Sequence, residues 1–184
     1  HPTVLPDEAK LHADTVVVGE VEDVWEKLIA DYVEHKLAPF YRAEFPTLHR
    51  EVIPRIDLIN LKKYHKMPFS SLPTIPIETS RGCPYGCDFC SVTKFYGSHH
   101  RSKPIENVVA EIKAIGAKYY FFCDVNIGAN SKRAKELFKA VAPLNIKWAG
   151  QFNISAAKDR ELLELARKSG CYAAYLGIES ICEA

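Results

Sequence analysis

Strand and helix patterns alternate along the chain from residue 74 onward, and this alternation limits the fold more than any other feature. Short apolar runs predict strands over residues 74–80, 119–125, 146–152 and 173–179. Helical patterns lie between them at residues 104–115, 131–141 and 158–169. Gly116 and Gly170 follow the first and third helices, where glycine commonly ends a helix. Such an alternation predicts an α/β fold with a parallel sheet and right-handed crossovers.

The first part of the chain predicts a separate and incomplete α/β unit. Residues 14–19 form an apolar, β-branched run that ends in Gly19 and is typical of a buried parallel strand. A loop is expected before this strand, and residues 20–35 carry a helical stripe. One strand and one helix cannot bury their apolar faces alone. We therefore expect residues 1–36 to be the C-terminal remnant of a larger domain.

The next segment, residues 37–73, shows no sustained hydrophobic period. It contains Pro39, Pro46, Pro54, Pro68 and Pro73. Proline interrupts helices and cannot donate a hydrogen bond to a sheet, so this segment predicts an interdomain linker with one short helix near residues 58–64. The third domain is then expected over residues 74–184.

Composition narrows the possible partners and the compartment. Lys and Arg number 24 against 23 Asp and Glu, a net charge of +1, which gives no basic footprint for nucleic acid or an anionic membrane. No apolar run approaches the roughly 18 residues of a membrane span, and no signal-peptide pattern is present. Three of the six cysteines are scattered, which fits a reducing cytosol better than a disulfide framework. The sequence predicts a cytoplasmic protein that does not bind nucleic acid.

Three cysteines in the loop after the first strand of the third domain indicate a metal cluster. Cys83, Cys87 and Cys90 have a C-x3-C-x2-C spacing. Structural zinc sites and ferredoxin clusters normally have four protein ligands, whereas three cysteines leave one iron of a [4Fe-4S] cubane open to a small molecule. The motif therefore predicts a catalytic cluster. A zinc site completed by His99 or His100, and a disulfide with a spare thiol, stay open as alternatives.

The motif, with Phe89 directly before its third cysteine, resembles the radical S-adenosylmethionine (SAM) superfamily. The resemblance implies a (β/α)6 partial barrel, of which residues 74–184 would be the front half. It also implies that the three thiolates hold a [4Fe-4S] cluster whose unique iron binds the amino and carboxylate groups of SAM. An electron from the reduced cluster would cleave SAM to a 5'-deoxyadenosyl radical, with flavodoxin or ferredoxin as the electron donor.

Polar residues at the ends of the predicted strands are candidates for SAM contacts, because active sites of such folds lie at the carboxyl ends of the strands. The resemblance implies that Phe89 touches the adenine, that Asp124 contacts the SAM amino group, and that Glu179 and Ser180 bind the ribose. Gln151, at the end of the third strand, is a candidate cofactor or substrate contact. Structural roles stay open for these residues: packing for Phe89, a helix cap or loop hydrogen bond for Asp124, and an interior amide for Gln151.

A second resemblance concerns the start of the chain. Residues 1–8 and 16–22 are similar to the last βα unit of the cobalamin-binding domain that precedes many radical SAM cores. The D-x-H-x-x-G segment, whose histidine ligates cobalt in many members, is absent from this sequence and is expected upstream of His1, as further barrel elements are expected after Ala184. The resemblance implies cobalamin-dependent methyl transfer, or radical oxidoreduction, on a small organic substrate.

Two other functions stay open as alternatives to this prediction. A ferredoxin-like electron-transfer module would need a fourth cysteine ligand, and the remaining cysteines lie far from the motif in the sequence. A tRNA methylthiotransferase of the same superfamily would be expected to carry further cluster cysteines in its N-terminal part and a basic surface. Residues 1–82 contain no cysteine, and the net charge is near zero.

Overall fold

A computed structural model describes residues 1–49, 52–64 and 74–178. The chain divides into two compact units, one made of His1–Thr47 and Gly82–His99 and the other of Leu48–Arg81 and His100–Ala184. Each unit is considered by itself. The predicted domain boundaries near residues 36 and 73 stay a prediction.

The first unit is built around a two-stranded parallel sheet. Strand β1 (Val16–Val18) pairs with β2 (Phe40–Arg42), and the register places Val16 opposite Phe40. The other elements of this unit are α1 (Pro6–Lys10), the 3-10 helix η1 (Val21–Asp23), α2 (Trp25–Val33) and α3 (Val92–Tyr96). The predicted strand and the helix after it are thus present.

Two expectations for this unit were wrong. The segment before β1 is not all loop, because Pro6 begins α1 at a position where its missing N–H costs no hydrogen bond. The segment after residue 36 contains β2, although we predicted no strand there. Three residues are too few to show a period of two, and only the long-range pairing with β1 makes them a strand.

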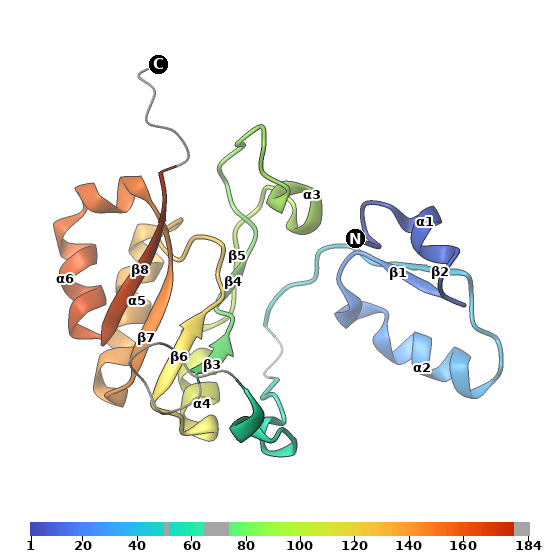
Figure 1. The fold of residues 1–184 in the computed structure, drawn as a ribbon, viewed down its shortest axis with the longest axis horizontal. Coiled ribbons are helices and arrows are strands. Elements are labelled where there is room, and N and C mark those ends of the chain that lie inside the picture. The colour runs from blue at the N-terminus through green and yellow to red at the C-terminus, as the bar shows by residue number, and fades with distance from the viewer. Residues whose placement is uncertain (50–51, 65–73, 179–184) are drawn as a thin grey trace. The chain divides into compact units, whose positions relative to one another are not determined.

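The second unit contains a four-stranded parallel sheet in the order β3-β6-β7-β8 (Figure 1). Its strands are β3 (Thr74–Ile77), β6 (Tyr119–Phe122), β7 (Lys147–Asn153) and β8 (Cys171–Gly177). The helices α4 (Ile105–Ile115), α5 (Ser131–Val141) and α6 (Arg160–Lys168) connect successive strands from β3 onward. All seven elements overlap the segments predicted from the sequence, and the prediction of an α/β fold with a parallel sheet is confirmed.

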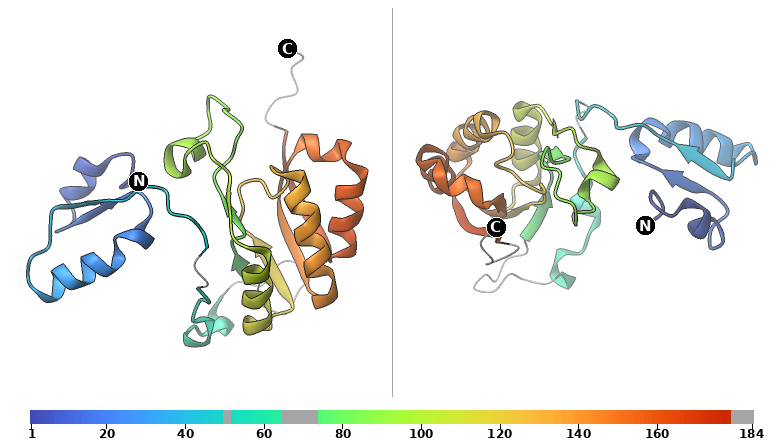
Figure 2. Two further views of the ribbon diagram at one scale, coloured as in Figure 1. Left: turned by 180° about the vertical axis from the view of Figure 1, so that it is seen from behind. Right: turned by 90° about the horizontal axis from the view of Figure 1, so that it is seen from above.

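The three helices lie on one face of this sheet, as Figure 2 shows, and the hydrophobic core fills the space between helices and sheet. Trp148 is fully buried at its centre, with its ring stacked on Phe122 at 4.7 Å between centroids and tilted against Phe138 at 5.0 Å. The indole N–H donates to Ser169 Oγ at 3.1 Å, so the one polar atom of this ring is satisfied. This packing fixes the sheet and therefore the positions at which its strands end.

Several short elements complete the second unit. Strand β4 (Ser80–Arg81) pairs antiparallel with β5 (Arg101–Ser102), an arrangement that the sequence did not predict. The 3-10 helices are η2 (Ile56–Leu58), η3 (Leu61–Lys63), η4 (Ala142–Leu144) and η5 (Ile154–Lys158). Within the part of the chain that the structure describes, no helix combines the length and the apolar character needed to cross a bilayer.

Candidate active site at the cysteine loop

The three cysteines of the motif lie in a loop of the first unit, residues 82–99. All three are free thiols; Cys83 and Cys90 are partly buried and Cys87 is exposed. The Cys90 N–H donates to the Cys87 carbonyl at 3.0 Å, which forms a tight turn between the second and third cysteine. Because all three thiols are free, the alternative of a disulfide with a spare thiol is wrong for this structure.

The chemistry of these side chains fits an iron-sulfur cluster. Thiolates are the usual ligands of iron-sulfur clusters, and the loop offers three of them within eight residues. Among residues 1–49, 52–64 and 74–178, no group of three or more His, Cys, Asp or Glu side chains is gathered closely enough for a single metal ion. A lone zinc needs sulfur ligands about 2.3 Å from one centre, whereas a cubane takes each thiolate on a different iron. Three thiolates, each on a different iron, are the ligand set that the motif offers to such a cluster.

The base of the loop requires glycine. Gly82 has φ +82°, and a Cβ at this position would lie only 2.2 Å from the His99 carbonyl oxygen. Any other residue would be strained by the backbone angle and would also collide with the opposite end of the loop. Gly82 therefore allows the chain to enter the loop next to the point where it leaves.

In the second unit, β4 and β5 form the two-stranded stem from which this loop departs, here called the stem (residues 79–81 and 101–103). Ser80 lies opposite Ser102 in the antiparallel register. At the end of the stem away from the cysteine loop, the Lys103 N–H donates to the Thr79 carbonyl at 2.9 Å. Both ends of the cysteine loop thus continue from one hydrogen-bonded pair of strands.

Asp124 follows β6 and lies beside the stem, with 1% of its surface exposed. Its Oδ1 accepts the backbone N–H groups of Thr79 at 2.7 Å and Ser80 at 2.6 Å, and its Oδ2 accepts the Thr79 hydroxyl at 2.6 Å. Burial raises the pKa of Asp124, while these hydrogen bonds and the nearby Arg133 charge act in the opposite direction. The loop hydrogen bond that we held open for this residue is present; its predicted contact with SAM stays a prediction.

Arg133, in the first turn of α5, joins the two strands of the stem. Its Nη2 donates to the Thr79 carbonyl at 3.0 Å and to the Lys103 carbonyl at 2.9 Å. Burial lowers the pKa of Arg133, and the charge of Asp124 raises it. Arg133 was not a candidate in the sequence, because an arginine in a helix is usually a solvated surface residue.

Four further residues were predicted from the sequence to bind SAM or the substrate. Phe89 is 73% exposed in the cysteine loop, and the Gln151 side chain on β7 is exposed. Glu179 and Ser180 lie outside the described residues. The predicted roles of all four in binding SAM or substrate therefore stay predictions.

Asn126, two residues after Asp124, is a further polar residue at the carboxyl end of β6. It is buried, and its Oδ1 accepts the N–H of Gly128 at 3.1 Å and, more weakly, that of Asn153 at 3.4 Å. Its Nδ2 is buried and has no hydrogen-bond partner among the described residues. Asn126 thus links the ends of β6 and β7, and its amide NH2 group is not used within the described part of the chain.

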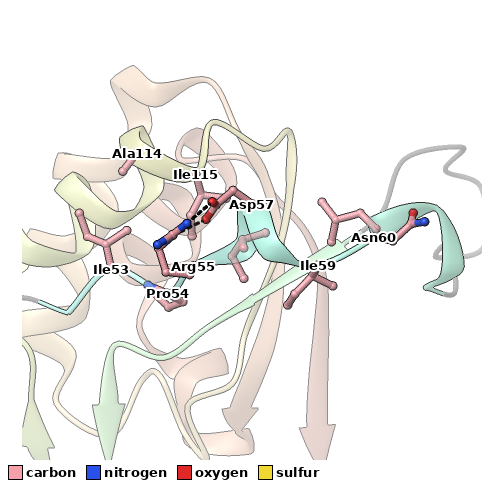
Figure 3. Close-up of a pocket in the computed structure, with 10 residues that line it drawn as sticks. Ile53, Pro54, Arg55, Asp57, Ile59, Asn60, Ala114 and Ile115 are labelled. Atoms are coloured by element: carbon pink, nitrogen blue, oxygen red, sulfur yellow. Dashed lines mark hydrogen bonds and ion pairs between the residues drawn. The ribbon is translucent and has the colours of Figure 1, made fainter.

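A cavity of about 690 Å³ lies elsewhere in the second unit, between residues 53–61 and the C-terminal end of α4 (Figure 3). Four of its ten described lining residues are isoleucines, and Ala114 and Ile115 are contributed by α4. An ion pair in its wall joins Arg55 to Asp57 through two hydrogen bonds of 2.8 and 2.7 Å, so these charges are paired with each other. Among the described residues predicted to bind a cofactor, none lines this cavity.

Comparisons with known proteins agree with the motif. The chain is 35% identical to the bacteriochlorophyllide d C-12(1)-methyltransferase of Chlorobaculum tepidum over 98% of its length and 41% of that protein. It is 28% identical to the anaerobic magnesium-protoporphyrin IX monomethyl ester cyclase of Cereibacter sphaeroides, over 92% of its length and 32% of the cyclase. The chain therefore spans about two fifths or less of these relatives.

A solved structure shares the fold. The cobalamin-dependent SAM radical enzyme OxsB, with aqua-cobalamin and SAM bound, matches 97% of this chain and 30% of its own with a TM-score of 0.74 and 17% sequence identity. Residues 77–184 match the sequence profile of the radical SAM superfamily. This span contains all three motif cysteines, the stem and the whole parallel sheet except Thr74, Ile75 and Pro76 of β3. The chain belongs to the radical SAM superfamily.

Proposed function

We propose that this chain is the cluster-bearing part of a cobalamin-dependent radical SAM methyltransferase. The observation that carries the proposal is the set of three free thiols in one loop of a chain that belongs to the superfamily. The methyltransferase named above supports methyl transfer as the reaction. A cytoplasmic location, and flavodoxin or ferredoxin as the electron donor, remain part of the proposal.

In this proposal Cys83, Cys87 and Cys90 are the ligands of a [4Fe-4S] cluster. When bound, the cluster supplies the electron that cleaves SAM reductively, and this chemistry belongs to the cofactors. The protein provides the thiolates, their spacing, and a loop base that Gly82 and the stem hold together. It must also orient SAM through groups near the strand ends.

The proposed SAM contacts are Phe89 for the adenine, Glu179 and Ser180 for the ribose, and Gln151 for the cofactor or the substrate. Asp124 is a more restricted candidate than the sequence suggested. A carboxylate offers about four lone-pair positions, and three donors of the stem already use Asp124. A contact with the SAM ammonium would use the acceptor position that is left.

Cobalamin is the proposed carrier of the methyl group. The support is the likeness of residues 1–35 to the end of a cobalamin-binding domain and the fold shared with an enzyme described as cobalamin-dependent. The chain includes no D-x-H-x-x-G segment. We therefore place the main cobalamin contacts outside this sequence.

The proposed substrate is a small organic molecule, and a tetrapyrrole is the first class to test. Both relatives described above are named for tetrapyrrole substrates. The sheet face opposite the helices also carries aromatic rings in edge-to-face pairs, Tyr119 with Tyr172 at 6.2 Å and Phe121 with Tyr175 at 5.7 Å. Such rings suit contact with a flat apolar molecule.

The test is anaerobic reconstitution of the complete protein with iron, sulfide and cobalamin, followed by SAM, a reductant and a bacteriochlorophyllide. We expect 5'-deoxyadenosine together with a methylated product. Deoxyadenosine accompanied by ring closure or oxidation would favour the cyclase-type reaction, for which the second relative is the supporting observation. A full cluster with no SAM cleavage under any reductant would overturn the proposal.

A further inference from the structure

The two ends of the cysteine loop are held by two polar side chains from other elements, one buried and one partly buried. Asp124 comes from the carboxyl end of β6 and Arg133 from the first turn of α5. Both contact Thr79 in the stem, which is 45 and 54 residues away from them in the sequence. Neither belongs to the hydrophobic core, and both make polar contacts with backbone atoms of the stem and with the Thr79 hydroxyl.

We propose that Asp124 and Arg133 are positioning residues that fix the stem and, through it, the spacing of the three cluster cysteines. The inference rests on the proposed function, because it assumes that the loop carries a cluster. It assigns Asp124 a role that does not depend on contact with SAM, and it adds Arg133, which is not among the residues predicted to bind the cofactor.

Asp124 holds the first strand of the stem. A single oxygen, Oδ1, accepts two successive backbone N–H groups, those of Thr79 and Ser80, and this arrangement fixes the peptide between them. The Thr79 hydroxyl binds the other oxygen. Hydrogen bonds to an ionised acceptor are roughly twice as strong as neutral ones, so a carboxylate restrains this backbone far more than an amide would.

Arg133 holds the two strands together. Its guanidinium donates from one nitrogen to carbonyls on opposite sides of the stem, Thr79 and Lys103, at 3.0 and 2.9 Å. The planar fork of arginine directs its donors rigidly, whereas the ammonium of lysine is a compact point charge on a flexible stem. Lys would preserve the charge at this position but not the bridge.

The two side chains also depend on each other. Asp124 is buried and Arg133 is partly buried, and each charge stabilises the other. Removing one of a buried pair leaves an uncompensated charge and is strongly destabilising, so alanine variants would report on folding more than on positioning. Arg133→Lys and Asp124→Asn keep the volume and are the informative substitutions.

The experiment compares these variants in the complete protein with Lys135→Arg as the matched control. Lys135 lies on the same helix, but its ion pairs run to Asp159 and Glu161, away from the stem. The first measurement is amide hydrogen exchange in the apoprotein. The second is the rate at which a chelator removes iron from the anaerobically reconstituted protein.

We expect the Thr79, Ser80 and Lys103 amides to exchange roughly tenfold faster in both variants, the ratio for the loss of one strong hydrogen bond, with the core amide of Tyr120 unchanged. Iron loss should accelerate by a similar factor, and Lys135→Arg should match the wild type in both measurements. Should Asp124→Asn fail to fold, Arg133→Lys decides the question, because it retains the positive charge beside Asp124.

Exchange and iron-loss rates equal to those of Lys135→Arg would overturn the inference. It would also be overturned if Asp124→Asn weakened SAM binding while every stem amide and the iron-loss rate stayed at wild-type values, since Asp124 would then act on SAM alone. A wild-type protein that takes up no cluster would instead reject the proposed function. In that case the exchange data would still report whether the stem is held as described.

Discussion

The cysteine loop and the stem differ in how far their residues are exposed to solvent. Between Cys83 and Cys90 every residue is exposed, and Phe89 projects 73% of its surface into solvent. In the stem, Thr79 and Ser80 are buried and their backbone donors are satisfied by Asp124. The comparison teaches that the fold itself holds the ends of the loop, whereas the segment between its first and third cysteines has few buried contacts.

This division follows from the energetics of metal sites. The free energy of binding a metal group offsets the conformational entropy that its ligands lose when they become ordered. A loop that binds such a group therefore needs few contacts of its own. The ends of the loop must nevertheless be placed, because the entropy lost on closing a flexible loop opposes cluster assembly. Under the proposed function, the stem would remove part of that cost before a cluster binds.

The largest expected effect tests the loop. Replacing Cys83, Cys87 or Cys90 by alanine should remove most of the cluster absorbance after anaerobic reconstitution, because a [4Fe-4S] cluster with only two protein ligands is poorly held. The sheet should stay folded, since the three thiols belong to the loop and not to the core. Visible absorbance, iron content and far-ultraviolet circular dichroism measure the two outcomes together.

The matched control is Cys123→Ala, which removes another exposed free thiol, next to Asp124 and outside the motif. It should retain the full cluster. Retention of a full cluster in all three motif variants would show that the loop is not the ligand set, and the contrast between loop and stem would lose its functional meaning.

An intermediate effect is expected at Glu179, whose proposed role is to bind the ribose of SAM. Glu179→Gln should weaken SAM binding by about 1.5–3 kcal/mol, the range for a hydrogen bond that involves a charged group, while cluster content stays unchanged. A SAM titration followed through the electron paramagnetic resonance of the reduced cluster measures the dissociation constant. An unchanged constant in a protein that binds SAM would remove Glu179 from the site.

The smallest effect is expected at Asp159, which caps the N-terminus of α6. Its carboxylate accepts hydrogen bonds from Ser131 Oγ at 2.7 Å and Leu162 N at 3.0 Å and pairs with Lys135 at 3.0 Å, which lowers its pKa from 3.8 to about 2. A depressed pKa in the folded state stabilises the protein fully above pH 3.8, and this contribution is lost as the pH falls toward 2.

Asp159→Asn should therefore lower the free energy of unfolding near pH 6 and have little effect near pH 2. Urea unfolding at both pH values measures the difference between the variant and the wild type. Glu164→Gln, an exposed substitution on the same helix, is the control. A difference that is the same at both pH values would mean that the charge of Asp159 does not stabilise the cap.

The sequence alone was sufficient for the parallel sheet, its three covering helices and the family. These features depend on local patterns, an apolar run for each strand and a helical stripe for each helix, and the sheet that the patterns predict is the one observed. The C-x3-C-x2-C motif is equally local. Its chemistry depends on residue type and spacing, which can be read from eight consecutive positions.

Only the tertiary structure decided what holds the cysteine loop. Strand β2 and the β4–β5 pair are too short to show a period, and they exist because distant segments pair with them. The partners of Thr79 are Asp124 and Arg133, 45 and 54 residues further along the chain. A charged side chain that is withdrawn from water needs hydrogen-bond partners, and the packing of the sheet determines which backbone groups lie within reach of it. No local sequence pattern specifies contacts between residues that lie so far apart in the chain.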